Sequence, residues 1–138
     1  MTGRRGMMGS TVEAQTGSRR VLVVEDELMI RMLLEDMLAE LGYTIAVAAA
    51  HLDEALRAAQ NADFDVAVLD VNLNGVPISP VADALVVRGM PFVFATGYGE
   101  EGLPDLYRDR PTLKKPFQLD NLKEALQRAL ARKGAQES

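Results

Sequence analysis

Short, mainly apolar runs alternate with stretches of helical period along most of this 138-residue chain. The runs are VLVV at 21–24, TIAVAA at 44–49, DVAVLDV at 65–71 and FVFA at 92–95. Runs this short and this rich in valine predict strands that are buried on both faces. The alternation of such strands with helices predicts right-handed βαβ crossovers, and therefore a parallel sheet that helices cover on both sides.

The stretches between the runs carry apolar residues at helical spacing. The first predicted helix runs from Leu28 to Gly42, where the glycine ends it, and the second from His51 to Gln60. A third helix is predicted to begin near Pro80, and a closing helix near Asp120, which is its expected N-cap. The residues expected to face the core from the first two helices are Ile30, Leu33, Leu34, Met37, Leu38 and Leu41, then Leu52, Ala55, Leu56 and Ala59.

The segment after the fourth run is rich in glycine and proline, so any helix between Glu100 and Arg108 should be short. Residues 112–114 form the last predicted strand. Five strands alternating with five helices predict an α/β fold, a three-layer, doubly wound, five-stranded parallel sheet. We expect this domain to cover residues 19–133, between a flexible tail at 1–18 and a frayed end at 134–138.

Composition limits where the chain works and what it binds. It has no cysteine, which excludes disulfides and thiolate metal sites and agrees with a reducing compartment. No run approaches the roughly 18 apolar residues of a membrane span, and no signal peptide is visible, so we expect a cytoplasmic protein with no membrane contact. The formal net charge of the chain is −5, but residues 1–20 carry four arginines and one glutamate, a charge of +3. The remaining residues therefore carry −8, which disfavours nucleic-acid binding by the domain.

Polar residues end several of the predicted strands. In doubly wound sheets, ligands bind beyond the carboxyl ends of the strands, where Glu25, Asp26, Asp70, Thr96 and Lys115 stand. A carboxylate inside an apolar run costs several kcal/mol unless it is paired. Three carboxylates together predict a hard divalent cation, magnesium or else manganese.

The other two side chains at this edge predict an anionic ligand. Lys115 supplies a compact positive charge and Thr96 a hydroxyl donor, so a phosphoryl group that bridges the metal is the obvious candidate. The carboxylate of Asp70 is the candidate nucleophile, because the chain has no cysteine and its one histidine, His51, lies elsewhere in the sequence.

Four motifs, in this order and at strand ends, resemble the receiver domain of two-component response regulators. They are VLVVEDE, VAVLDVN, FATG and LKKPF, and the similarity covers about residues 19–133. The resemblance implies the flavodoxin-like, or CheY-like, (βα)5 fold. It also implies a sensor histidine kinase or a histidine phosphotransfer protein as the phosphodonor, and an unidentified protein as the downstream target.

The resemblance assigns a role to each site residue. It makes Asp70 the phosphoacceptor. Asp26 then binds Mg²⁺ directly and Glu25 through water, and the backbone carbonyl of Asn72 completes the protein ligands. Thr96 matches the hydroxyl that moves toward the phosphoryl group. Lys115 matches the lysine that pairs with that group, and the resemblance implies a cis bond to Pro116.

The chain departs from most receivers in two places. It reads DVNLNGVPISP where most carry methionine, proline and glycine after the phosphoacceptor, and Thr112 stands where most carry an aromatic switch residue. Together with PFVFATGYGEEGLP and a reduced fourth helix, this resembles a subset of stand-alone alphaproteobacterial receivers with a PFxFATGY motif. We hypothesise that Tyr98 takes over part of the missing aromatic's role.

We therefore predict a single-domain response regulator rather than an enzyme, monomeric or weakly dimeric, whose output is a protein contact or a phosphorelay, because little length remains for an output domain. Two alternatives remain. A haloacid dehalogenase-type phosphohydrolase also uses an aspartate with threonine, lysine and magnesium, but it needs a second aspartate where Asn72 stands. A receiver-like interaction module that is never phosphorylated is the other.

Overall fold

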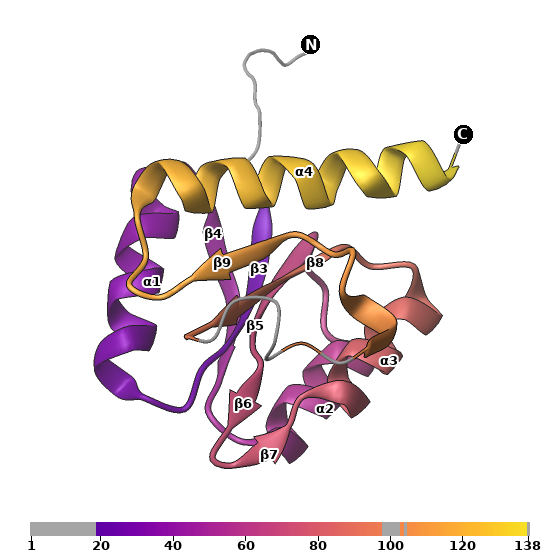
Figure 1. The fold of residues 1–138 in the computed structure, drawn as a ribbon, viewed down its shortest axis with the longest axis horizontal. Coiled ribbons are helices and arrows are strands. Elements are labelled where there is room, and N and C mark those ends of the chain that lie inside the picture. Colours follow the sequence, from indigo (N-terminus) through magenta and orange to yellow (C-terminus); the bar gives the residue numbers. More distant parts are fainter. Residues whose placement is uncertain (1–18, 98–102, 104, 138) are drawn as a thin grey trace, which may run out of the picture.

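A computed structural model of the chain describes residues 19–97, 103 and 105–137. The segment 1–18, assigned above to a flexible tail, and Tyr98 lie outside the described residues. Five strands form one parallel sheet in the order β4-β3-β5-β8-β9 (Figure 1), as predicted for a doubly wound fold. Their bounds are β3 (Arg20–Val24), β4 (Thr44–Ala49), β5 (Val66–Asp70), β8 (Phe92–Thr96) and β9 (Thr112–Lys114).

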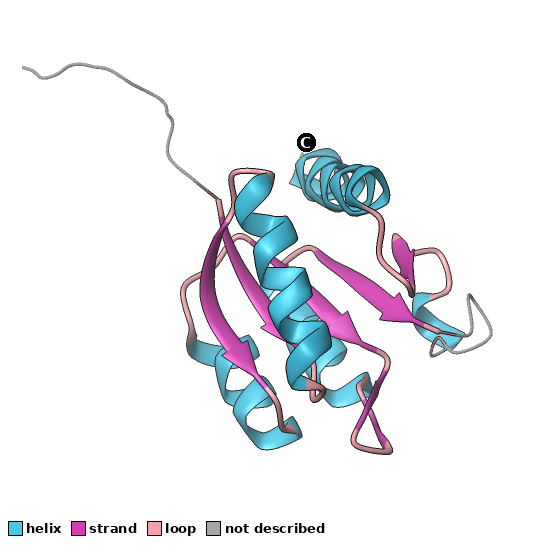
Figure 2. Cartoon of the chain, turned by 90° about the vertical axis from the view of Figure 1, so that its left-hand side faces the viewer, coloured by secondary structure: helices cyan, strands magenta, loops and turns pink. Residues whose placement is uncertain are grey.

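Helices cover both faces of this sheet, which confirms the three layers (Figure 2). The helices α1 (Leu28–Glu40) and α4 (Leu119–Glu137) pack on one face, and α2 (Leu52–Asn61) and α3 (Ser79–Arg88) on the other. Among the described residues there are four α-helices rather than five. The short 3-10 helix η2 (Asp105–Tyr107) lies where the reduced fourth helix was expected. No helix in these parts of the chain is long and apolar enough to cross a membrane.

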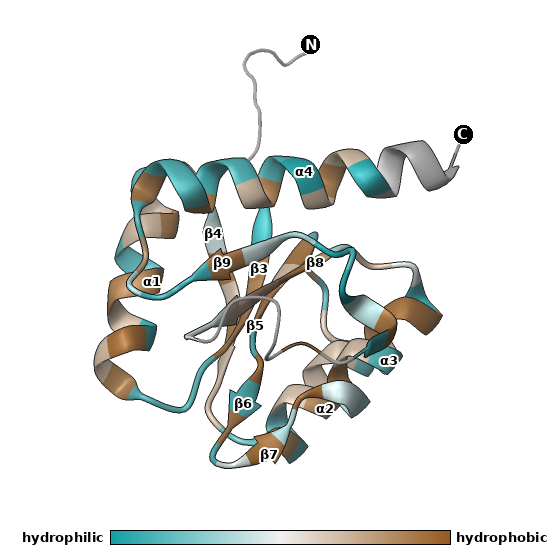
Figure 3. Ribbon diagram, in the orientation of Figure 1, coloured by the Kyte–Doolittle hydropathy of each residue, from teal (hydrophilic) through white to brown (hydrophobic). Residues whose placement is uncertain are grey.

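The central strands bury side chains on both faces, which explains their apolar runs. Leu69 and Phe94 point toward α2 and α3, whereas Val68 and Val93 point toward α1 and α4, and all four are fully buried. Figure 3 shows the apolar colouring running through these strands. Each such side chain contributes roughly 1.5–3 kcal/mol by its burial, so these strands contribute strongly to the stability of the fold.

Three details differ from the sequence prediction. Leu33 is 48% exposed, because α1 has apolar residues on nearly every side and only the stripe through Leu34, Met37 and Leu38 meets the sheet. Asp120 is not the N-cap of α4, since the helix already begins at Leu119. The backbone of α4 stays helical through residues 134–137, which were expected to fray.

A small hairpin follows β5 and was not predicted. Its strands are β6 (Asn72–Leu73) and β7 (Val76–Pro77), paired antiparallel. Asn74 and Gly75 join them with φ values of 54° and 78°. Positive φ at both central residues defines the type I′ turn, for which Asn-Gly is the favoured sequence. The local signal was therefore present, but two-residue strands have no apolar period to detect.

Candidate functional site

Strand pairing brings the acidic residues together. β3 and β5 run side by side as far as Val24 and Leu69, so Glu25 follows one strand at the level where Asp70 ends the other. Parallel strands present their carboxyl ends at one edge of a sheet. Oxygens from Glu25, Asp26 and Asp70 lie within 4.8 Å of one another, as expected from the sequence.

The same pairing continues across the sheet to the hydroxyl and the lysine. Asp70 is level with Ala95 in β8, so Thr96 is the next residue beyond it. Thr96 is in turn level with Lys114 in β9, and the N–H of Lys115 donates to the Thr96 carbonyl at 3.0 Å. Four separate segments of sequence therefore reach one point.

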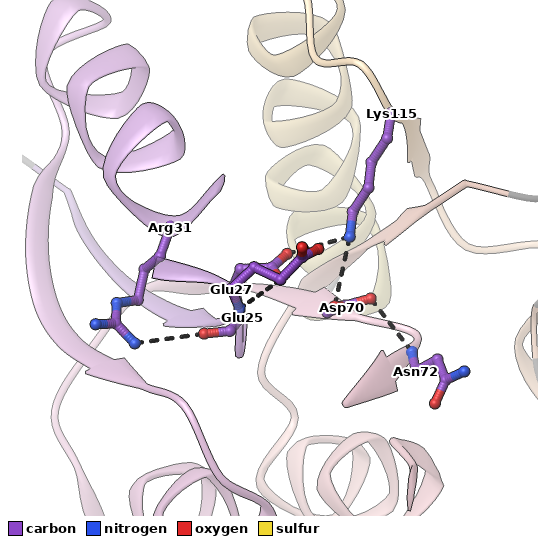
Figure 4. A network of polar contacts seen from close by, with 6 residues as sticks. All are labelled: Glu25, Glu27, Arg31, Asp70, Asn72 and Lys115. Carbon is purple, nitrogen blue, oxygen red and sulfur yellow. Dashed lines mark hydrogen bonds and ion pairs between the residues drawn. The ribbon is translucent and has the colours of Figure 1, made fainter. Parts of the chain in front are cut away.

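Lys115 is the cation of the cluster. Its Nζ lies 3.2 Å from Glu25 Oε1 and 3.4 Å from Asp70 Oδ2 (Figure 4). Glu25 is 1% exposed and Asp70 6%, so both ion pairs are shielded from bulk water. The peptide bond between Lys115 and Pro116 is cis. One lysine thus faces two buried carboxylates, which leaves the cluster with excess negative charge.

Burial in this cluster shifts the pKa values of both carboxyl groups upward. Burial raises the pKa of Glu25 to about 7, assisted by the charge of Asp70 and opposed by the backbone N–H of Glu27 and by Lys115. Burial also raises the pKa of Asp70, against the opposing charge of Lys115. Burial acts to lower the pKa of Lys115, but the two carboxylates outweigh it and the pKa rises. The site thus favours a bound cation, which would relieve the repulsion.

Backbone groups hold both carboxylates in place (Figure 4). Glu25 Oε2 accepts a hydrogen bond from the N–H of Glu27 at 3.1 Å, and Asp70 Oδ1 accepts one from the N–H of Asn72 at 3.3 Å. Arg31 donates to the backbone carbonyl of Glu25 at 3.5 Å. These bonds set the direction of each carboxylate before any ligand arrives.

The donor set fits magnesium. Mg²⁺ prefers oxygen ligands and is usually held by one or two carboxylates together with water and phosphate oxygens. Glu25, Asp26 and Asp70 supply such oxygens. Glu25 Oε1 is buried and accepts no well-aligned hydrogen bond, so its described partner is the ion pair with Lys115. A nearby cation, or a water bound to a cation, would stabilise a buried carboxylate oxygen that accepts no hydrogen bond.

A cavity of about 670 Å³ opens beside the acids. It is lined by Asp26 and Glu27 after β3, by Asp70, Thr96 and Lys115 at the ends of the other strands, and by Asn72, Asn74, Gly75 and Pro77 of the hairpin. Thr96 is 2% exposed. The nucleophile, hydroxyl and lysine expected from the sequence therefore share one cavity, and the hairpin wall is the part that sequence reasoning missed.

The described residues contain a buried aromatic cluster that the sequence analysis did not find. Tyr107 packs edge-on against Phe92, with ring centroids 5.7 Å apart, and at a tilt against Phe94 at 6.0 Å. Its hydroxyl donates to Asp83 of α3, and burial with this partner raises the pKa of Tyr107 to about 12. Thr112, which stands at the position of the usual aromatic switch residue, donates its hydroxyl hydrogen bond to the Arg110 carbonyl. No periodic signal marks a lone tyrosine in a short 3-10 helix.

A family comparison agrees with this geometry. Residues 21–127 match the response regulator receiver domain. The chain belongs to this receiver family. Among curated relatives, the receiver is 34% identical to the transcriptional regulatory protein PdtaR of Mycobacterium tuberculosis over 133 residues, which are 91% of this chain and 64% of PdtaR. The chain thus spans less than two thirds of the length of PdtaR. It is also 36% identical to the transcriptional regulatory protein TcrA from the same organism, and it spans 47% of the length of TcrA.

Solved structures give the same fold. The solution structure of SdrG from Sphingomonas melonis Fr1 is 42% identical, with a TM-score of 0.75, and covers 85% of this receiver and 99% of SdrG. The receiver domain of PhyR from Erythrobacter litoralis is 35% identical with a TM-score of 0.68, covering 83% of this chain and 91% of that domain. The predicted CheY-like fold and the resemblance to the alphaproteobacterial subset are confirmed.

Proposed function

We propose that the chain acts as a response regulator that stores a signal as a phosphoryl group on Asp70. The observation that carries the proposal is the contact of one lysine with two buried carboxylates. Lys115 Nζ lies 3.4 Å from Asp70 and 3.2 Å from Glu25, in a cavity that Asp26 and Thr96 also line. This arrangement combines a nucleophile, a cation and a hydroxyl donor around space for a small anion.

Mg²⁺ is the proposed cofactor. Asp26 and Asp70 would hold it, with Glu25 through water and the backbone carbonyl of Asn72. When bound, the ion would neutralise charge on the phosphoryl oxygens and on the acidic cluster. The proposal is supported by the proximity of the three carboxylates and by the raised pKa of Glu25.

Phosphoryl transfer from a phosphohistidine needs little from this protein beyond positioning and charge. A carboxylate oxygen of Asp70 attacks phosphorus, the P–N bond to the donor imidazole breaks, and its electron pair returns to the ring nitrogen. Lys115 neutralises the phosphoryl oxygens, and Thr96 donates a hydrogen bond to one of them. The signal ends by hydrolysis: water attacks phosphorus, the P–O bond to Asp70 breaks, and inorganic phosphate leaves.

The proposed donor is a sensor histidine kinase or a histidine phosphotransfer protein, in line with membership of the receiver family. The proposed output is a protein contact or a phosphorelay. A solution structure of the relative SdrG, 42% identical with a TM-score of 0.71, represents its BeF3-activated conformation. We propose that this chain also has an activated arrangement, which phosphorylation of Asp70 favours. Tyr98 remains the proposed aromatic participant.

Intact mass spectrometry tests the proposal. Wild type and Asp70→Asn are incubated with a small phosphodonor, acetyl phosphate, in Mg²⁺ or in chelator. We expect wild type in Mg²⁺ to gain the mass of one phosphoryl group, and we expect no gain in chelator or in the variant. The variant is a close control, because it keeps the size of the side chain and the acceptor for the Asn72 N–H.

A second donor guards against a false negative, since a phosphorylated kinase presents a different leaving group and its own docking surface. If wild type gained no mass from either donor, the proposal would fail and the interaction module would be the better account. The haloacid dehalogenase alternative is set aside because the chain belongs to the receiver family.

A further inference from the structure

The hairpin β6–β7 forms one wall of the Asp70 cavity and starts two residues after the nucleophile. The base of the hairpin packs on the hydrophobic core. Leu73 is 1% exposed and Ile78 is fully buried, and both belong to the core between the sheet and α2 and α3. The N–H of Asn72 is bonded to Asp70 Oδ1 at 3.3 Å. The base of the hairpin is therefore held by contacts with the core and with the proposed phosphoacceptor.

The tip of the hairpin has a tie of its own. The side-chain amide of Asn74 donates to the Ala50 carbonyl at 3.2 Å, across a separation of 24 residues, and the same nitrogen lies 3.5 Å from His51 Nδ1. Ala50 directly follows Ala49, whose carbonyl accepts the N–H of Glu25 at 3.0 Å. The tie thus leads from the hairpin tip to the segment that bonds the backbone of Glu25.

This tie matters because the hairpin is too short to hold itself. Two-stranded hairpins are marginally stable in water, and each strand here has two residues. Val76 is 40% exposed, so the outer strand gains little from burial. A single hydrogen bond contributes about 0.5–1.5 kcal/mol, which is enough to shift such a marginal element between two arrangements several-fold.

We propose that Asn74 is a positioning residue, whose amide on the Ala50 carbonyl holds the hairpin, and with it the backbone of Asn72, in the arrangement that binds Mg²⁺ beside Asp70. The proposal rests on the proposed function only for the identity of the cation. When the tie is removed, the hairpin spends less time in the competent arrangement, and the apparent affinity falls by the fraction lost.

Asn74→Gly is the decisive variant. Glycine accepts the φ of 54° at this turn position without strain, so the change removes the amide and spares the backbone. Asn61→Ala is the matched control, since Asn61 also donates a side-chain amide to a carbonyl, that of Arg57 at 3.1 Å, within α2. His51→Ala separates the contribution of the histidine from that of the Ala50 carbonyl.

The measurements are Mg²⁺ affinity, by titration of ¹H–¹⁵N spectra with the metal alone, and amide hydrogen exchange of the hairpin without metal. For Asn74→Gly we expect a dissociation constant about 3- to 10-fold higher than in wild type, with faster exchange in β6 and β7 and unchanged exchange in β3 and β5. Asn61→Ala and His51→Ala should both stay within about twofold of wild type in affinity.

Several results would overturn the proposal. One is an Asn74→Gly protein that binds Mg²⁺ as tightly as wild type and has an equally protected hairpin. A loss in His51→Ala equal to that in Asn74→Gly would remove the role of the Ala50 carbonyl. Should the glycine variant not fold, Asn74→Asp keeps a turn-forming residue but turns an acceptor toward that carbonyl. Because its added charge would itself attract Mg²⁺, this variant is judged by amide exchange without metal, where the same faster exchange in β6 and β7 is expected.

The role of Asn74 and the phosphorylation of Asp70 can be refuted separately. A wild-type protein that binds no Mg²⁺ would overturn the role of Asn74 in metal binding. A wild-type protein that binds Mg²⁺ and loses affinity in Asn74→Gly, yet accepts no phosphoryl group on Asp70, would overturn only the proposed function.

Discussion

The buried carboxyl of Glu25 should make the stability of the metal-free protein fall as pH rises through the neutral range. Its pKa is about 7 in the folded protein, against an ordinary value of 4.5. The unfolded chain therefore releases this proton near pH 4.5, whereas the folded protein keeps it until about pH 7. Between these values the unfolded state binds fewer protons, so the free energy of unfolding decreases as pH increases.

The magnitude follows from the two pKa values. At about 1.4 kcal/mol per pH unit, the full effect is on the order of 3 kcal/mol, most of which falls between about pH 5 and pH 8. Glu25 is 1% exposed, so screening by bulk water reduces this little. The raised pKa of Asp70 acts in the same direction, and the raised pKa of Lys115 acts only at alkaline pH.

Glu25→Gln isolates the effect of this one group, because glutamine has the shape of the protonated acid and does not titrate. Urea unfolding followed by circular dichroism, in chelator, at several values between about pH 5 and pH 8 gives the free energy of unfolding of both proteins. We expect the variant to gain roughly 2–3 kcal/mol relative to wild type across this range and to be the more stable protein at pH 8.

Glu40→Gln makes the same chemical change on the exposed end of α1 and should follow wild type. Parallel curves for wild type and Glu25→Gln would refute the reasoning, because they would mean that Glu25 is as well solvated in the folded protein as in the unfolded chain.

Two further predictions concern contacts outside the cavity. Tyr107→Phe keeps the ring but removes the hydrogen bond to Asp83, and should lower the free energy of unfolding by about 1–2 kcal/mol in urea, with Asp83→Asn changing it less. Arg88 donates to the carbonyls of Ala59 and Ala62, at 2.6 and 2.9 Å, which the end of α2 leaves without helical partners. Arg88→Ala should therefore cost about 1–2 kcal/mol in thermal unfolding, and an equally stable variant would contradict this.

The sequence predicted the sheet well because its signals are local and strong. Each central strand is a continuous apolar run, and such runs are typical of strands that are buried on both faces in the middle of a layered fold. The helices were predicted less accurately at their edges. In α1, Leu33 fits the helical period as well as Leu34 does, and only the distance of each side chain from the sheet decides which one is buried.

The residues around the cavity could be predicted from one geometric rule. Asp26, Asp70, Thr96 and Lys115 each follow or end a strand, and parallel strands deliver such residues to one edge. Which oxygen faces which nitrogen could not be predicted, since it depends on the register between strands. The burial of Glu25, which makes that carboxyl a candidate pH-sensitive group, and its contact with Lys115 are visible only in the structure.

The hairpin shows where sequence reasoning stops for a physical reason. Its turn could be read from Asn74 and Gly75, but the contact of its tip with the rest of the molecule is the bond from Asn74 to Ala50, two residues that are far apart in the chain and carry no complementary pattern. Such a bond is weak by itself and acts only because the strands beside it are short. If the proposed role of Asn74 holds, the same weakness makes the element adjustable, because small changes at the tip would alter metal binding while Asp70, Lys115 and the core stay as they are.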